Sequence, residues 1–139
     1  MIPTRLAVNT DKKTILLIDD DKSVYLSLKM VFDSKKFRVV YAESCDAAAR
    51  KLHRGLICHI IILDIMMPGA SGIDCLDKLM EMKIKAPVLV LSALDSYRPC
   101  RAAFKKGAAD YLAKPFQTEE LLDTVNKLLA PRRWRKTGR

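Results

Sequence analysis

The sequence predicts an α/β protein in which a doubly wound, five-stranded parallel sheet carries helices on both faces. Short, continuous apolar segments recur along the chain, as they do in strands that are buried on both faces. Each segment is followed by an amphipathic stretch with helical spacing, and this alternation is typical of parallel sheets with crossover helices. The 139 residues, half of them hydrophobic, suit one domain with one substantial core.

Five strands are expected. The clearest is the apolar block 60–63, which runs into a single carboxylate, Asp64, before the turn signal Pro68-Gly69. The segments 14–18 and 88–91 are apolar blocks of the same kind. The segment 37–42 is more mixed, which indicates a place near an edge of the sheet, and 110–113 is a short fifth strand.

Five helices alternate with these strands. Ser44 and Thr118 are expected to be N-caps of the second and fifth helices, while Gly55 and Gly107 end the second and fourth. The residues expected to face the core recur at helical spacing: Val24, Leu28, Val31 and Phe32 in the first helix, Ala48 and Leu52 in the second, Ile73, Leu76 and Met80 in the third, Cys100, Ala103 and Phe104 in the fourth, and Leu121, Val125, Leu128 and Leu129 in the fifth.

Composition and charge limit the classes of function. No apolar run approaches the ~20 residues of a membrane span, and residues 1–12 read as a flexible lead-in without the apolar centre of a signal peptide. We therefore expect a soluble, cytoplasmic protein with no membrane partner. The net charge is +9, and five basic residues lie in the tail 131–139 together with Trp134. A solvated tail or linker stub is the expected interpretation, so nucleic acid is not expected to bind the domain at 13–130.

The four cysteines are expected to be reduced thiols. Cys45, Cys58, Cys75 and Cys100 form no C-x-x-C pair, and no histidine stands at zinc-binding spacing from them. Such residues are typical of the core of a cytosolic protein.

Polar side chains follow four of the five predicted strands. Right-handed crossovers place the carboxyl ends of parallel strands at one edge of the sheet, so Asp19, Asp20, Asp64, Ser92 and Lys114 are expected to lie together. Three adjacent carboxylates repel one another unless a cation is present. Magnesium fits best, because it prefers oxygen ligands. Asp20 and Asp64 are the expected direct ligands, and Asp19 is expected to hold a bound water.

This set of groups predicts phosphoryl transfer to Asp64. A carboxylate can act as the nucleophile and form an acyl phosphate. The metal would neutralise charge on the transferring oxygens, Lys114 would hold another of these oxygens, and the Ser92 hydroxyl could bond a third.

Four motifs then resemble the CheY-like receiver domain of two-component response regulators. They are Ile-Leu-Leu-Ile-Asp19-Asp20-Asp21, Ile-Leu-Asp64-Ile-Met-Met-Pro68-Gly69, Leu-Ser92-Ala93 and Gly107-Ala-Ala-Asp110-Tyr111-Leu-Ala-Lys114-Pro115-Phe116. They occur in the family's order and spacing, and the resemblance covers about 13–130. It implies a flavodoxin-like fold with strand order 2-1-3-4-5.

The resemblance also implies roles for single residues. Asp64 would accept a phosphoryl group from a phosphohistidine of a sensor histidine kinase or phosphotransfer protein. Asp19, Asp20, Asp64 and the backbone carbonyl of Met66 would bind Mg²⁺, for which Mn²⁺ is a possible substitute.

Four further roles follow from the same family. Lys114 would bind the phosphoryl group, and a cis peptide would precede Pro115. Ser92 and Tyr111 would be the switch pair that reports phosphorylation on the fourth helix, fifth strand and fifth helix. That face would contact a downstream protein or a missing effector domain, or form a homodimer.

Other functions stay open. Asp19-x-Asp21 also resembles the nucleophile motif of haloacid-dehalogenase-type phosphatases, with Asp21 as general acid, although the chain is short for such an enzyme and Asp64 is left without a role. A receiver-like scaffold that binds a partner without phosphorylation is the other alternative. Only nine residues follow Ala130, which favours a single-domain regulator over a receiver cut from a longer protein, and does not decide between them.

Overall fold

The computed structural model describes residues 12–33, 36–65, 72–93 and 103–130. These residues form a five-stranded parallel sheet with the order β2-β1-β3-β4-β5, which confirms the predicted fold class and the edge position of the second strand. The strands are β1 (Lys13–Ile18), β2 (Phe37–Ala42), β3 (Ile60–Asp64), β4 (Val88–Ala93) and β5 (Asp110–Lys114).

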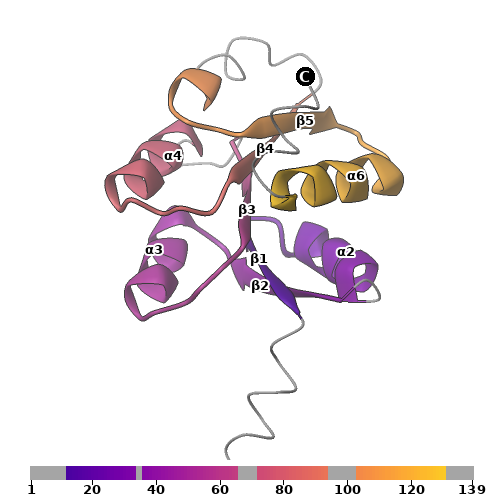
Figure 1. The fold of residues 1–139 in the computed structure, drawn as a ribbon, viewed down its shortest axis with the longest axis horizontal. Coiled ribbons are helices and arrows are strands. Elements are labelled where there is room, and N and C mark those ends of the chain that lie inside the picture. The colour runs from indigo at the N-terminus through magenta and orange to yellow at the C-terminus, as the bar shows by residue number, and fades with distance from the viewer. Residues whose placement is uncertain (1–11, 34–35, 66–71, 94–102, 131–139) are drawn as a thin grey trace, which may run out of the picture.

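Helices cover both faces of the sheet. In Figure 1, α2 (Lys22–Asp33) and α6 (Thr118–Leu129) lie on one face, while α3 (Cys45–His53) and α4 (Gly72–Glu81) lie on the other. Most of the predicted fourth helix, including Cys100, lies outside the described residues. Its end is present as helical residues 103–105, and the chain turns at Gly107 with φ +109°. Within the described ranges, the helices are too short or too polar to cross a membrane.

The sheet separates two apolar cores because alternate residues of a strand point to opposite faces. Ile18 and Leu63 pack on the side of α3 and α4. Leu17 and Ile62 pack on the side of α2 and α6. The central strands are therefore buried on both faces, which explains why their sequences are continuous apolar blocks.

Two local predictions need correction. Helix α4 buries Cys75, Leu76 and Leu79, whereas Ile73 and Met80 are only half-buried. Leu76 is buried as predicted, Ile73 and Met80 pack against the same core without being fully buried, and the prediction missed Cys75 and Leu79. Thr118 is the first residue of α6 rather than its cap, because Gln117 has the extended backbone of an N-cap.

The predicted cap of α3 is present. Ser44 has an extended backbone, and its side chain accepts a hydrogen bond from the backbone N–H of Ala47 at 3.0 Å. The helix ends at His53 with Arg54 as its C-cap, and Gly55 follows with a φ of +102°, which favours glycine. Local sequence signals therefore determine both ends of this helix.

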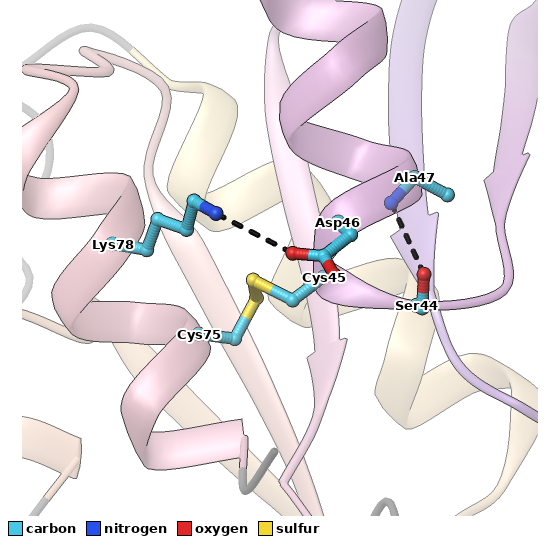
Figure 2. Close-up of a disulfide and its surroundings, with 6 residues drawn as sticks. All are labelled: Ser44, Cys45, Asp46, Ala47, Cys75 and Lys78. Carbon is cyan, nitrogen blue, oxygen red and sulfur yellow. Dashed lines mark hydrogen bonds and ion pairs between the residues drawn. A yellow bond between two sulfur atoms is a disulfide. The ribbon is translucent and has the colours of Figure 1, made fainter. Parts of the chain in front are cut away.

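The expectation of four reduced thiols is wrong for two of them. Cys45 and Cys75 form a disulfide with a Cα–Cα distance of 5.6 Å. They are 30 residues apart in the sequence, and the fold brings the first turns of α3 and α4 side by side, as Figure 2 shows. Cys58 is a free thiol whose pKa is raised by burial.

Reduction of the Cys45–Cys75 bond should lower the free energy of unfolding by about 2–4 kcal/mol, because it frees the unfolded chain from a closed loop. Urea unfolding of the oxidised and reduced protein measures the difference. Cys58→Ser is the control and should respond to reductant as the parent does. Equal unfolding midpoints with and without reductant would contradict the prediction.

Candidate functional site

The register of the sheet brings the predicted site residues together. Ile18 pairs with Leu63, so the following residues, Asp19 and Asp64, lie at the same level of the sheet. Asp64 pairs with Leu91 of β4, one residue before Ser92. On the far side of β4, Ala93 pairs with Lys114. The carboxyl ends of four strands therefore supply the site, as predicted.

The site is divided between the two faces of the sheet. Asp64 alternates with Ile60 and Ile62, whose side chains pack on the side of α2 and α6. Lys114 alternates in the same way with Leu112. Ser92 lies two residues after Val90, so its side chain points to the other face of the sheet, toward α3 and α4.

Three carboxylates meet at this edge. One carboxylate oxygen each from Asp19, Asp20 and Asp64 lies within 4.8 Å of the others. Asp19 is fully buried and Asp64 nearly so, while Asp20 is exposed. Asp19 Oδ1 accepts a hydrogen bond from the backbone N–H of Asp21 at 2.9 Å, but its buried Oδ2 has no hydrogen-bond partner.

Burial and crowding of like charge change the acidity of Asp19. Its pKa rises to about 6, mainly because burial disfavours the carboxylate. The hydrogen bond from Asp21 opposes this shift, and the negative charge of Asp64 adds to it. The site thus holds a carboxylate that is costly to ionise without a nearby cation.

A divalent cation fits this donor set. The three side chains offer only oxygen atoms, one of them buried and unpartnered, and this is the ligand chemistry that Mg²⁺ prefers. The described residues thus supply a candidate Mg²⁺ site made by Asp19, Asp20 and Asp64. Met66, whose carbonyl was expected to contribute, lies outside the described residues.

Lys114 reaches the carboxylate at the centre of the site. Its Nζ lies 3.2 Å from Asp64 Oδ2, and the Lys114 side chain is about one-third exposed. The peptide bond between Lys114 and Pro115 is cis, the geometry expected from the resemblance. Lys114 therefore offers a positive charge from the side opposite the acidic pair on β1.

The two residues expected to form a switch lie on one side of the sheet. Ser92 is fully buried. Tyr111 pairs with Val90, so its side chain lies on the same face of the sheet as that of Ser92. Tyr111 is 40% exposed. Its ring packs edge-on against Phe104, with 5.8 Å between ring centroids. Tyr111 is thus in an outward position.

Asp21 does not belong to the acidic cluster. Its Oδ1 accepts hydrogen bonds from the backbone N–H and the hydroxyl of Ser23, at 2.9 and 2.6 Å, at the start of α2. These bonds lower the pKa of Asp21. A general acid needs a proton to give, so this environment does not suit the phosphatase role considered for Asp21.

Two features of the site were not found in the sequence. Gly72 packs on the backbone beside Asp64: its N–H donates to Ile65 O at 3.3 Å, and an added Cβ would collide with Ile65 Cα. A groove of about 770 Å³ also opens beside Asp64. Its lining comes from the ends of β3 and β5, from α2 and α6, and from the segment between β5 and α6: Ser23, Val24, Ser27, Leu28, Val31, Asp64, Lys114, Pro115, Phe116, Thr118 and Leu121.

Replacement of Asp19 by Asn should stabilise the metal-free protein at neutral pH. With a native pKa of about 6 against an ordinary 3.8, folding favours the protonated acid, so this group's contribution to stability falls as pH rises from 4 to 6. The neutral side chain should add up to about 3 kcal/mol at pH 7. Urea unfolding of the variant and the parent in EDTA at pH 4 to 8 measures this difference in the free energy of unfolding.

Asp123→Asn, a change at an exposed position of α6, is the matched control and should leave the pH dependence unchanged. In saturating Mg²⁺, Asp19→Asn should instead lower the free energy of unfolding, because the Asp19 carboxylate of the parent then contributes to metal binding. A less stable variant in EDTA would contradict the cause given for the raised pKa.

Comparison with known proteins agrees with this geometry. Residues 15–126 match the sequence model of the response regulator receiver domain. PetR of Rhodobacter capsulatus is 37% identical over 116 residues, which are 83% of this chain and 48% of PetR. The transcriptional regulatory protein CpxR of Escherichia coli K12 is 33% identical over 120 residues, 86% of this chain and 50% of CpxR. The chain thus spans about half the length of these relatives.

Solved structures show the same fold. The receiver domain of a Francisella response regulator is 33% identical with a TM-score of 0.76, covering 90% of this chain and 98% of that domain. The chemotaxis protein CheY4 of Vibrio cholerae is 26% identical with a TM-score of 0.76, covering 85% of this chain and 99% of CheY4. Fold, site geometry and relatives agree: the chain belongs to the response regulator receiver domains of two-component signalling.

Proposed function

We propose that residues 13–130 form a cytoplasmic signalling switch in which Asp64 accepts a phosphoryl group from a phosphohistidine of a sensor histidine kinase or phosphotransfer protein. The observation that carries the proposal is the position of Asp64 between the carboxylates of Asp19 and Asp20 and the ammonium of Lys114, 3.2 Å away. The domain would catalyse only its own phosphorylation and dephosphorylation.

The proposed step is a transfer between two nucleophiles. An Asp64 carboxylate oxygen attacks the phosphorus atom, the phosphorus–nitrogen bond breaks, and the imidazole leaves with the electron pair. Bound Mg²⁺ would supply positive charge to the transferring oxygens. Lys114 balances charge on the other side, and the nearly complete burial of Asp64 limits the access of water. Asp20 and Asp64 would hold the metal directly, with the Met66 carbonyl, and Asp19 through a water.

The proposed output uses the outward position of Tyr111. When the phosphoryl group binds the Ser92 hydroxyl, space opens on the same side of the sheet and the Tyr111 ring turns inward. Its contact with Phe104 would then be lost, so the surface around residues 103–107, β5 and α6 would change. A downstream protein, an effector domain or a second copy of the chain could read that change.

The groove between α2 and α6 supports a protein as the phosphodonor. Val24, Leu28 and Leu121 line the groove beside Asp64 and Lys114, so a partner can place an apolar side chain against them while its phosphohistidine reaches the carboxylate. An apolar surface of this kind favours docking of a protein over use of small donors alone.

Incubation with acetyl phosphate and Mg²⁺ should add one phosphoryl group to the parent and none to Asp64→Asn, because the amide is not a nucleophile. Intact-protein mass spectrometry measures the addition. Asp21→Asn should be labelled like the parent, which separates this function from a phosphatase using Asp19 and Asp21. An unlabelled parent with an unchanged Tyr111 environment in beryllofluoride and Mg²⁺ would favour the phosphorylation-independent scaffold.

Filling the groove should separate protein donors from small donors. Ser27→Trp should slow phosphoryl transfer from a histidine kinase by about tenfold or more, because the indole occupies the space a partner needs. Labelling by acetyl phosphate should stay as in the parent. Lys29→Trp, on the other side of α2, removes only an exposed ion pair with Asp33 and is the control. Equal kinase-dependent rates in both variants would exclude the groove as the docking surface.

A further inference from the structure

The Cys45–Cys75 disulfide lies between the two backbone segments that hold the acidic site. On one side, Asp19 N–H donates to the carbonyl of Ala42 at 3.1 Å, and Cys45 follows Ala42 by three residues. The intervening Ser44 fixes the start of α3 through its bond to Ala47. The position of Cys45 is therefore coupled to the backbone of Asp19.

On the other side, Cys75 is three residues beyond Gly72 in the first turns of α4. Gly72 donates to Ile65 O, and a Cβ at Gly72 would lie 2.9 Å from the carbonyl oxygen of Asp64. This contact leaves little room for α4 to move without moving the backbone of Asp64. The disulfide thus joins the segment that positions Asp19 to the one that positions Asp64.

A second polar contact between α3 and α4 is weak by comparison. Asp46 and Lys78 form an ion pair at 3.4 Å, beside the disulfide in Figure 2, and their side chains are 77% and 46% exposed. Exposed pairs of this kind contribute little to stability. Apolar packing around Cys45 and Cys75 remains when the bond is reduced. Reduction should therefore loosen this interface without unfolding it.

We propose that the Cys45–Cys75 pair is a redox modification site that sets the Mg²⁺ affinity of the acidic cluster: the disulfide form binds Mg²⁺ tightly and accepts the phosphoryl group readily, and the dithiol form does so less well. The inference rests on the proposed function, because it concerns the regulation of the same site. The partner it implies is a dithiol–disulfide exchange protein.

That partner supplies the electrons and protons that reduce the disulfide. A thiolate of its dithiol attacks one sulfur of the pair, the Cys45–Cys75 bond breaks, and the other sulfur leaves as a thiolate. The partner's second thiolate then attacks the mixed disulfide, so the partner ends as a disulfide and this chain holds two thiols. Two electrons and two protons pass from partner to chain, and oxidation is the reverse.

Two properties of the pair suit such a site. In a reducing compartment such as the proposed cytoplasm, protein disulfides are usually transient, catalytic or redox-sensing rather than permanent. Cys45 and Cys75 are 8% and 1% exposed, so the α3–α4 interface must open before exchange. Small reductants should therefore react slowly with this disulfide, so that exchange between the disulfide and dithiol forms needs a specific partner.

The test compares the oxidised and reduced forms of the whole chain, verified by mass after alkylation of free thiols. Mg²⁺ titration by calorimetry should give a Kd at least about fivefold higher for the reduced protein. Labelling by acetyl phosphate at subsaturating Mg²⁺ should slow by a similar factor, and at saturating Mg²⁺ the two forms should converge. Equal Kd values in the two forms would overturn the inference.

The controls separate this inference from the proposed function. Cys58→Ser should keep the redox response, and Cys45→Ser with Cys75→Ser should lose it. If the serine pair does not fold, the parent supplies a reciprocal test: saturating Mg²⁺ should shift its thiol–disulfide equilibrium in a dithiol buffer toward the disulfide by the same factor. No shift would contradict the coupling. An Asp64 that is unlabelled in both forms, with a redox-dependent Mg²⁺ Kd, would instead refute the proposed function alone.

Discussion

The structure depends on the gathering of negative charge at one edge of the sheet. Asp19 and Asp64 are buried at the same level of neighbouring strands, and Asp20 completes the cluster. The central strands are apolar on both faces, so little water reaches the buried Asp19. Lys114 supplies positive charge beside Asp64, and the pKa of Asp19 is raised mainly by burial and further by the charge of Asp64, so the cluster is a favourable place for a cation.

Much of this could be predicted from the sequence, because the signals are local. The apolar blocks ending in Asp19 and Asp64 identify buried strands, and the handedness of crossovers places their ends together. Ser44 and Gly55 determine the ends of a helix through their own hydrogen bonds and backbone angles. The pairing of Ile18 with Leu63 then follows from the sheet, and with it the proximity of the two carboxylates.

The remaining features depend on contacts between distant residues, and a single sequence does not contain them. Cys45 and Cys75 carry no pairing signal, since only the packing of α3 on α4 brings them within 5.6 Å. The sequence does not show that Leu79 of α4 is fully buried while its neighbour Met80 is only half-buried, because this depends on how the helix packs on the sheet. The groove beside Asp64 needs two helices from opposite ends of the chain.

The alternation of side chains between the two faces of the sheet has a consequence for how related signalling proteins can diverge. Asp64 and Lys114 face the α2 and α6 side, while Ser92 and Tyr111 belong to the other. If Asp64 receives the signal as proposed, the sheet separates the α2 surface that would bind the phosphodonor from the surface around Tyr111 that would report phosphorylation. After a gene duplication, mutations on α2 can rewire the first without disturbing the second. Two copies of such a domain can then accept phosphoryl groups from different donors while they still act on the same downstream target.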